Sequence, residues 1–146
     1  MSISKKNKGS TLYFMRVDCE ASPFQSSLLN ESGDVTAIDW EDIITIRDKA
    51  ERKLLRKLSV FGKRYKFSFI NKLVSKLWYG HCIRITKRSS ELFSSYDEVI
   101  TSRMHGHILS CLVDTPNKIL DNSYGKNSGY YSQWTKEIGF TVLVKG

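Results

Sequence analysis

Apolar residues recur with helical spacing through the middle of this chain. One set begins at Ile46 and continues with Ala50, Leu54, Leu58 and Phe61. A repeat near every fourth residue places these side chains on one stripe of a helix, with lysines and arginines on the opposite side. We expect that helix to stop at Gly62. A second apolar stripe over residues 70–78 predicts another helix that runs to Gly80, and a weaker period from Cys82 indicates a third.

Short runs of β-branched and aromatic residues predict strands toward both ends of the chain. The predicted strands cover residues 11–17, 97–101, 117–121 and 140–144. A helical stripe that starts at Met104 separates the second and third of these strands, which predicts a parallel β-α-β unit with a right-handed crossover. Turn-forming residues dominate 22–34 and 122–131, so both segments are expected to be loops. Asp39, after a short apolar piece at 35–38, is a plausible helix N-cap.

Length and composition indicate one globular domain. The chain has 146 residues, of which 40% are hydrophobic, and this is enough to bury a core. No apolar run reaches 18 residues and no signal-peptide core follows the first residues, so we expect a cytoplasmic protein. Cys19, Cys82 and Cys111 form no CxxC pair, which argues against a disulfide framework and a zinc site and favours reduced, mostly buried thiols.

The net charge of +8 raises the hypothesis of a nucleic-acid partner. Most of this charge falls in residues 5–8 and 47–76, on stretches that also have the pattern of amphipathic helices. A solvated helix face or a membrane-surface contact explains the same pattern. We therefore favour the solvated face or the membrane surface over nucleic acid.

The second predicted strand leads directly into a helix, and candidate chemistry lies at this junction. Thr101, Ser102, Arg103 and His105 fall at the helix N-terminus, on the carboxyl edge of the sheet, where α/β proteins bind ligands. Free backbone N–H groups favour an anion there, and the guanidinium suits a carboxylate or a phosphate. A histidine donates hydrogen bonds or moves a proton near neutral pH, and Gly106 allows a ligand or a strand to approach closely.

A purely structural explanation exists for each of these residues. The hydroxyl groups could cap the helix, and Arg103 could pair with Asp97 or Asp121. His105 and His107 could be polar groups at the edge of a core. Two histidines two positions apart face opposite sides of a helix, and no third ligand stands nearby, so we predict no metal site.

A second polar cluster follows the third predicted strand, over residues 121–130. In a parallel unit it lies at the same edge of the sheet as the first cluster. Lys126, among small and flexible residues, could reach a phosphate that the glycine-containing backbone wraps. The alternative is a polar surface turn with an ordinary lysine.

These residues resemble a known family. The segment Thr101-Ser102-Arg103-Met104-His105-Gly106 resembles the Thr-x-Arg-Leu-His-Gly signature of the polysaccharide pyruvyl transferases, with Met104 in place of leucine. Residues 116–134 resemble the segment after that signature in the exopolysaccharide-biosynthesis branch. The match is strongest over residues 96–137; upstream, residues 12–20 resemble a strand with an Arg-x-Asp element, and Asp39-Trp40 resembles a later landmark.

The resemblance implies a fold and a reaction. The fold would be α/β, a Rossmann-like parallel sheet flanked by helices, similar to the carboxy-terminal domain of a glycosyltransferase-B-like arrangement. The donor would be phosphoenolpyruvate, with no other cofactor, and the product a pyruvate ketal on a sugar. His105 and Arg103 would be catalytic, with His105 as the acid at the enol carbon. The implied substrate-binding residues are Arg16, Thr101, Ser102, Gly106, His107, Asn122, Tyr124, Lys126, Asn127 and Ser128.

The resemblance begins inside the family's chain, so the amino-terminal half that shapes the acceptor side is expected to be absent. We therefore expect residues 1–146 to form one donor-binding domain that binds phosphoenolpyruvate weakly and turns over little by itself. A complementing amino-terminal chain and a saccharide acceptor, lipid-linked at the inner face of the membrane, are the expected partners. The alternatives are a remnant that only binds an anionic ligand, and a basic module that binds nucleic acid or a membrane surface.

Overall fold

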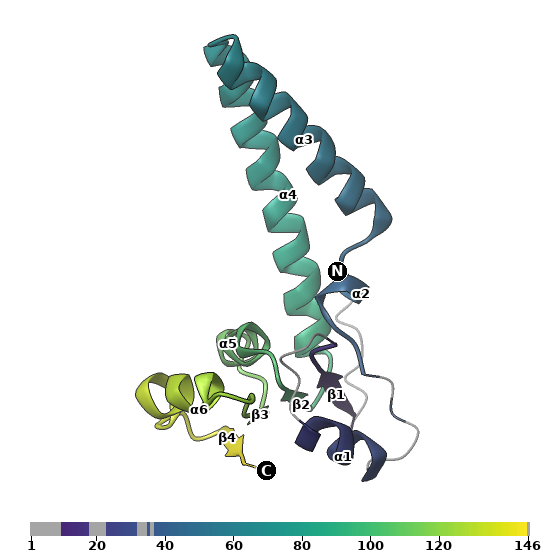
Figure 1. Ribbon diagram of the computed structural model, residues 1–146, viewed down its shortest axis with the longest axis vertical. Coiled ribbons are helices and arrows are strands. Elements are labelled where there is room, and N and C mark those ends of the chain that lie inside the picture. Colours follow the sequence, from purple (N-terminus) through teal and green to yellow (C-terminus); the bar gives the residue numbers. More distant parts are fainter. Residues whose placement is uncertain (1–9, 18–22, 32–34, 36, 146) are drawn as a thin grey trace. The chain divides into compact units, whose positions relative to one another are not determined.

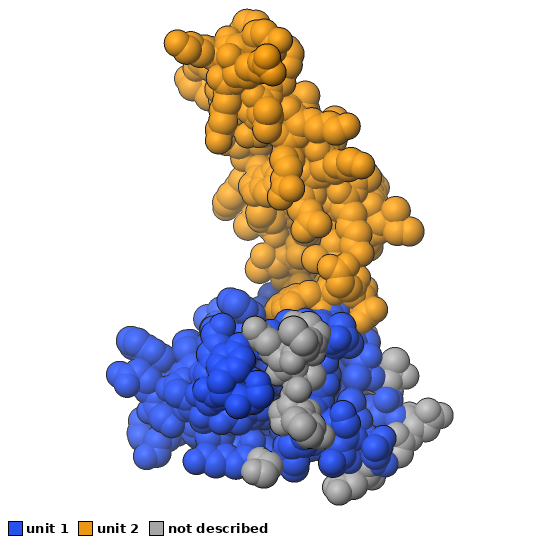
Figure 2. All heavy atoms as spheres, in the orientation of Figure 1, with its two compact units in different colours: residues 1–39, 90–146 blue, residues 40–89 orange. Residues whose placement is uncertain are grey.

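The computed structural model describes residues 10–17, 23–31, 35 and 37–145, which form two compact units. One unit combines residues 1–39 with residues 90–146, and the other comprises residues 40–89 (Figure 2). The expectations for Asp18, Cys19 and the basic residues 5–8 concern positions outside the described residues.

The first unit contains a four-stranded parallel sheet (Figure 1). Its strands β1 (Thr11–Phe14), β2 (Glu98–Thr101), β3 (Asn117–Leu120) and β4 (Thr141–Val144) lie side by side in chain order. All three neighbouring pairs are parallel, which confirms the predicted α/β class and the β-α-β unit. The first strand is shorter than predicted, and Ile38, at the end of the apolar piece 35–38, forms an isolated parallel bridge with Phe14.

Helices connect these strands. As predicted, α5 (Met104–Leu112) links β2 to β3. The two expected loops are wrong in part, because α1 (Pro23–Glu31) lies within the first, and α6 (Lys126–Tyr130) with the π-helical turn η1 (Tyr131–Thr135) occupies most of the second. Proline is favoured at the first position of a helix, where its missing N–H is not needed, and this accounts for the start of α1.

Both faces of the sheet carry a core. On one face, Met15, Ile100 and Leu120 are buried against Phe24 and Leu28 of α1. Phe14, the last residue of β1 and the one before Met15, faces the other side of the sheet, as alternation along an extended chain requires, and is fully buried. Its ring meets that of Phe93 edge-on, with centroids 5.0 Å apart. The sheet is therefore buried on both sides near the ends of β1, β2 and β3.

The second unit is a helical hairpin. It contains α2 (Trp40–Ile43), α3 (Ile46–Arg64) and most of α4 (Ser68–Ser94). The prediction that a helix stops at Gly62 is wrong, since α3 continues for two more residues. The predicted break after Gly80 is also wrong, because α4 runs through it as one helix. A single glycine inside a helix costs only about 1 kcal/mol, which a helix of this length tolerates.

The predicted apolar stripe of α3 lies on an exposed side of the hairpin. Leu54, Leu58 and Phe61 are 56%, 37% and 45% exposed, whereas the leucine that α3 buries is Leu55. Val74 is the corresponding buried residue of α4. The hairpin therefore presents apolar surface together with its charges.

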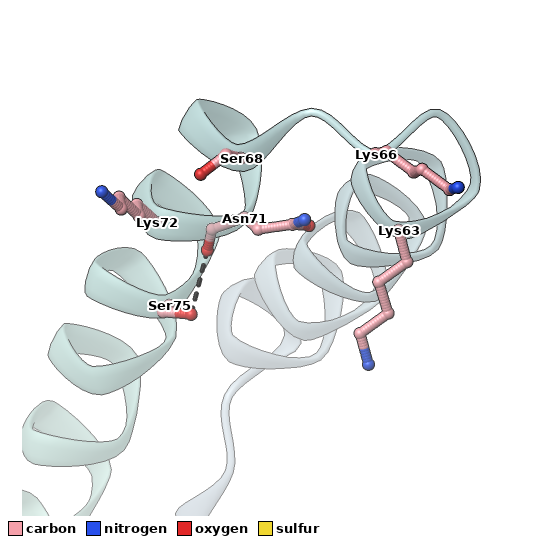
Figure 3. Close-up of a pocket in the computed structure, with 6 residues that line it drawn as sticks. All are labelled: Lys63, Lys66, Ser68, Asn71, Lys72 and Ser75. Carbon is pink, nitrogen blue, oxygen red and sulfur yellow. Dashed lines mark hydrogen bonds between the residues drawn. The ribbon is translucent and has the colours of Figure 1, made fainter.

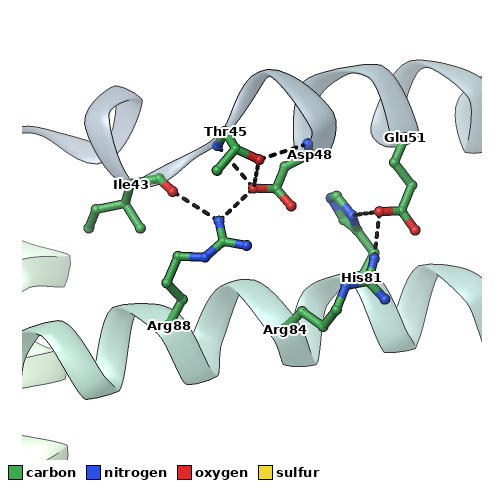
Figure 4. Close-up of polar contacts among 7 residues, drawn as sticks. All are labelled: Ile43, Thr45, Asp48, Glu51, His81, Arg84 and Arg88. Carbon is green, nitrogen blue, oxygen red and sulfur yellow. Dashed lines mark hydrogen bonds and ion pairs between the residues drawn. The ribbon is translucent and has the colours of Figure 1, made fainter. Parts of the chain in front are cut away.

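Polar contacts connect α3 to α4 (Figure 4). Thr45 and Asp48 form a capping box at the start of α3, in which each side chain accepts a hydrogen bond from the other's backbone N–H. Arg88 of α4 donates to the Asp48 carboxylate (2.6 Å) and to the carbonyl of Ile43 (3.1 Å). This guanidinium holds the pKa of Asp48 well below its usual range. Asp48 thus serves both as a helix cap and as an ionic link.

A second ionic link lies one turn further along. Glu51 accepts hydrogen bonds from Arg84 (2.5 Å) and His81 (3.1 Å). Asp48, Glu51 and His81 each bring one potential metal ligand within 4.8 Å of the others. Because Arg84 and Arg88 already neutralise both carboxylates, this cluster acts as an ion-pair network that fixes the register of the two helices.

Candidate functional site

Three chain segments meet at the carboxyl edge of the sheet, around Ser102. The backbone N–H of Arg16, just after β1, donates to the Ser102 hydroxyl at 2.9 Å. The side-chain amide of Asn127, in α6, donates to the carbonyl oxygens of Ser102 (2.9 Å) and Leu120 (2.8 Å). The segments after β1, β2 and β3 are therefore joined at one place, as the parallel sheet predicts.

Gln25 of α1 completes this junction, although no sequence pattern pointed to it. Its amide nitrogen donates to the carbonyl of Arg16 at 2.8 Å, and its amide oxygen accepts from the Ser102 hydroxyl at 2.5 Å. Gln25 lies in a segment that the sequence predicts to be a loop, so it belongs to no periodic pattern.

The N-terminus of α5 has unsatisfied backbone donors. The N–H of Arg103 donates to the Thr101 hydroxyl at 3.0 Å, and that of His107 donates back to the Arg103 carbonyl. Within the described part of the chain, the N–H groups of Met104, His105 and Gly106 have no acceptor, and no side chain caps the helix. Such amides, together with the positive end of the helix dipole, favour an anion.

Arg103 is held beside this helix terminus by Asp39. The Nε atom of Arg103 donates to Oδ1 of Asp39 at 2.9 Å, and Nη2 donates to Oδ2. Asp39 is 3% exposed, whereas the Arg103 side chain is 20% exposed. These contacts assign Arg103 a carboxylate partner other than the Asp97 or Asp121 considered from the sequence. Two parallel hydrogen bonds fix the plane of the guanidinium.

His105 and Lys126 are exposed, on the segments that follow β2 and β3. Neither side chain has a hydrogen bond or an ion pair with another described residue. His105 lies in the first turn of α5, next to the amides that have no acceptor. Tyr124 is also exposed, at 57%. His105 and Lys126 are therefore available to a ligand without the loss of an existing contact. Tyr124 has other interactions.

His107 lies in the interior, so the structure does not place it where it could contact a substrate. It is fully buried, with Nδ1 2.5 Å from the Asn117 side-chain oxygen and Nε2 2.8 Å from the Thr135 hydroxyl. Burial lowers the pKa of this imidazole below its ordinary value. His107 therefore links α5 to β3 and η1 as a neutral ring. The His105 side chain is exposed and the His107 side chain is buried, so the two histidines do not share a site.

Gly106 is required by helix–strand packing. A Cβ at this position would lie 2.7 Å from the Phe14 ring and 2.8 Å from the Thr101 hydroxyl. Of the two explanations considered from the sequence, the close approach is therefore that of the strand and not that of a ligand. This glycine lets the N-terminus of α5 lie directly on the sheet.

The polar loop before α6 uses its backbone donors internally. Asp121 Oδ1 accepts from the N–H groups of Asn122 and Ser128, and Asn122 Oδ1 accepts from those of Lys126 and Asn127. The expectation that this backbone wraps a phosphate is therefore not supported, because these amides are already occupied. Among the exposed donors here, the Lys126 ammonium remains available.

The predicted site residues thus separate by exposure. The exposed or partly exposed members are Arg16, Arg103, His105, Tyr124, Lys126 and Ser128; the buried members are Thr101, Ser102, Gly106, His107, Asn122 and Asn127. Among the buried members, Ser102 and Asn127 join the segments after β1, β2 and β3, and His107 connects α5 to β3 and η1.

Two further expectations can be compared with the described residues. Cys111 is partly buried and burial raises the pKa of its thiol, but Cys82 is exposed, so the prediction of mostly buried cysteines fails for Cys82. Among the helices of the described ranges, none is both long and apolar enough to cross a bilayer.

Comparison with known proteins supports the resemblance seen in the sequence. The chain is 33% identical over 135 residues to the protein named "Putative pyruvyl transferase EpsO" from Bacillus subtilis (strain 168). The match includes 92% of this chain and 39% of that relative, so the chain spans about two-fifths of the relative's length. No family model and no solved structure matches the chain. The resemblance to the pyruvyl transferases is therefore confirmed, and it extends over nearly the whole chain.

Proposed function

We propose that this chain supplies the donor-binding part of a polysaccharide pyruvyl transferase. The donor is phosphoenolpyruvate, and the product is a pyruvate ketal on a sugar of an exopolysaccharide or another cell-surface polysaccharide precursor. One observation carries most of the proposal: the unsatisfied amides at the start of α5 lie beside Arg103 and the exposed His105, within the motif that suggested the family. The two-domain, glycosyltransferase-B-like arrangement is part of the same proposal.

The donor is a small dianion or trianion, and the start of α5 suits it in two ways. The amides of Met104, His105 and Gly106 provide neutral donors that favour negative charge. Arg103 adds a guanidinium whose orientation Asp39 fixes in advance, so little side-chain entropy is lost when the donor binds. Lys126 supplies a mobile cation for the phosphate or for charge on the acceptor.

His105 is the proposed acid. It donates a proton to the terminal carbon of the enol, which becomes a methyl group, and the neighbouring carbon then forms a bond to one sugar oxygen. That sugar hydroxyl loses its proton, which restores His105. A second sugar hydroxyl attacks the same carbon as the bond to the phosphate oxygen breaks, and its proton leaves with the phosphate. One phosphoenolpyruvate and one sugar diol thus give one ketal and one phosphate.

The acceptor side is proposed to lie in the part of such a transferase that this chain does not span. The chain spans 39% of its relative's length, and the residues proposed for the donor all lie within this span. A saccharide acceptor, lipid-linked at the inner face of the cell membrane, is part of the proposal. We expect the isolated chain to bind donor and to form little ketal.

Calorimetric titration with phosphoenolpyruvate tests the proposal. Arg103→Lys keeps a cation opposite Asp39 but removes the planar guanidinium with its several N–H donors. This substitution should weaken donor binding about tenfold, which corresponds to the loss of one charge-assisted hydrogen bond. His105→Gln should weaken binding less and abolish any ketal formed when the complementing part is supplied. Lys136→Ala, at an exposed lysine outside the motif, is the matched control and should bind as the wild type does. Equal heats in all four proteins, or none in the wild type, would exclude this site.

A further inference from the structure

The hairpin has an uneven distribution of charge. Between residues 52 and 90 the chain contains twelve lysines and arginines and no aspartate or glutamate. Arg84 and Arg88 are paired with Glu51 and Asp48. Near the turn that joins α3 to α4, Lys63, Lys66 and Lys72 are exposed, and none has a carboxylate partner in the described part of the chain. This end of the hairpin is therefore strongly positive.

The turn itself has a defined structure. Gly62 is buried, and a Cβ there would lie 2.5 Å from the Asn71 side-chain oxygen, so the glycine lets α4 approach α3 closely. The N–H of Phe67 donates to the Gly62 carbonyl at 3.0 Å. Lys66 has a φ of 56°, in the left-handed region that a tight turn uses. These contacts define the path of the backbone through the turn, and residues 61 and 63–69 are exposed.

Those side chains include four exposed aromatic residues. Phe61, Tyr65 and Phe67 form a cluster, with ring centroids 4.7 Å apart for the first pair and 6.2 Å for Tyr65 and Phe67. They are 45%, 54% and 49% exposed, and the nearby Phe69 is 77% exposed. A contiguous apolar patch of this kind on a hydrated surface marks a contact with a partner.

A hollow beside the turn combines the same cations with neutral donors. It has a volume of about 670 Å³ and is lined by Lys63, Lys66, Ser68, Asn71, Lys72 and Ser75 (Figure 3). The Ser75 hydroxyl donates to the Asn71 carbonyl one turn earlier in α4. Ammonium, hydroxyl and amide groups around an open hollow suit a phosphodiester head group.

We propose that the α3–α4 turn docks on the surface of a bilayer that contains anionic phospholipids. The four aromatic side chains enter the interfacial region, and the lysines meet the lipid phosphates. The aromatic cluster favours a bilayer over duplex nucleic acid, because phosphate recognition has no use for apolar side chains whereas the acyl boundary accepts them. This docking is independent of the donor site, since its residues belong to the other unit.

Co-sedimentation of the full chain with vesicles tests this inference. The wild type should bind vesicles of phosphatidylcholine with phosphatidylglycerol, and should bind vesicles of phosphatidylcholine alone much less. Reversal of Lys63, Lys66 and Lys72 to glutamate should lower the affinity at least a hundredfold, since each lysine near an anionic surface contributes about a factor of five. Phe67→Ser with Phe69→Ser should lower it about tenfold or more, even with the charges intact.

Trp134→Ser and Lys136→Glu are matched controls, because both positions are exposed and lie in the other unit. They should leave vesicle binding unchanged. Far-ultraviolet circular dichroism checks that each variant keeps its helices. The inference is overturned if the wild type ignores anionic vesicles, if it binds duplex DNA in preference to them, or if the phenylalanine variant binds vesicles as tightly as the wild type.

Discussion

Asp39 and Arg103 lie 64 residues apart in the chain, yet the Arg103 guanidinium donates to both carboxylate oxygens of Asp39. The carboxylate is almost completely buried and the guanidinium only partly so. The segment before α2 is thereby attached to the N-terminus of α5. In the proposed function, Asp39 is a positioning residue, because it acts on the donor only through Arg103.

Removal of one partner from this pair should be costly. Arg103→Ala leaves a buried carboxylate without its guanidinium, and we expect the free energy of unfolding to fall by about 3 kcal/mol or more. Asp39→Ala with Arg103→Ala should cost less than the sum of the two single variants, because the double variant leaves no uncompensated charge. Chemical denaturation followed by circular dichroism measures all four proteins. Additive effects would show that the two residues are not coupled.

Gly106→Ala should destabilise the first unit. The new methyl group would overlap the Phe14 ring and the Thr101 hydroxyl, so α5 would have to move away from the sheet. Overpacking of this kind costs about 1–3 kcal/mol. Gly129→Ala is the matched control, since a Cβ there would meet no atom within 4 Å beyond its chain neighbours and its own helix backbone, and alanine is the better helix former. Thermal unfolding should show a lower midpoint for the first variant only; equal midpoints would contradict the packing described here.

The stability of the first unit should decrease as the solution becomes acidic. Burial lowers the pKa of His107, so the folded protein keeps this ring neutral while the unfolded chain takes up a proton below about pH 6.5. Stability is therefore complete above that pH and declines below it. His107→Gln should reduce this pH dependence, whereas His105→Gln, at an exposed position, should retain it. Denaturation midpoints measured on both sides of about pH 6.5 give the comparison, and an unchanged slope in His107→Gln would contradict the assignment.

The β-α-β unit is predictable because its signals are local. The strands β2 and β3 each contain a short buried run, and α5 begins directly after β2, so the sequence alone places residues 101–106 at the carboxyl edge of the sheet. His105 is exposed, and its role as an acid stays a prediction. The resemblance to the pyruvyl transferases depends on this same segment.

The sequence is less informative where distant contacts decide the structure. The partner of Arg103 is Asp39, which local spacing does not reveal, although Asp39-Trp40 resembles a landmark of the family. Gln25 joins Arg16 to Ser102 through contacts of a single polar side chain, which has no periodic signature. The interior position of His107 depends on Asn117 and Thr135. Each of these contacts is formed only when the fold is complete.

The hairpin shows why glycine is an ambiguous signal. The apolar pattern predicts that Gly62 ends a helix, but this residue lies inside the last turn of α3, where the absence of a side chain admits Asn71. Gly80 lies inside α4, and a Cβ added there would lie 3.8 Å from the side chain of Arg84. Gly62 is needed for close packing of the two helices, whereas Gly80 has space for a side chain. The sequence alone does not distinguish these two cases.

The proposed function depends on the binding of an anionic donor at the start of α5. Nuclear magnetic resonance tests this binding most directly. The backbone amide resonances of the full chain are monitored during titration with phosphoenolpyruvate. We predict saturable shifts for residues 103–106 and for Lys126, with little change at Lys63, Lys66 and Lys72. An absence of shifts at residues 103–106, or saturable shifts confined to the basic turn of the hairpin, would contradict it.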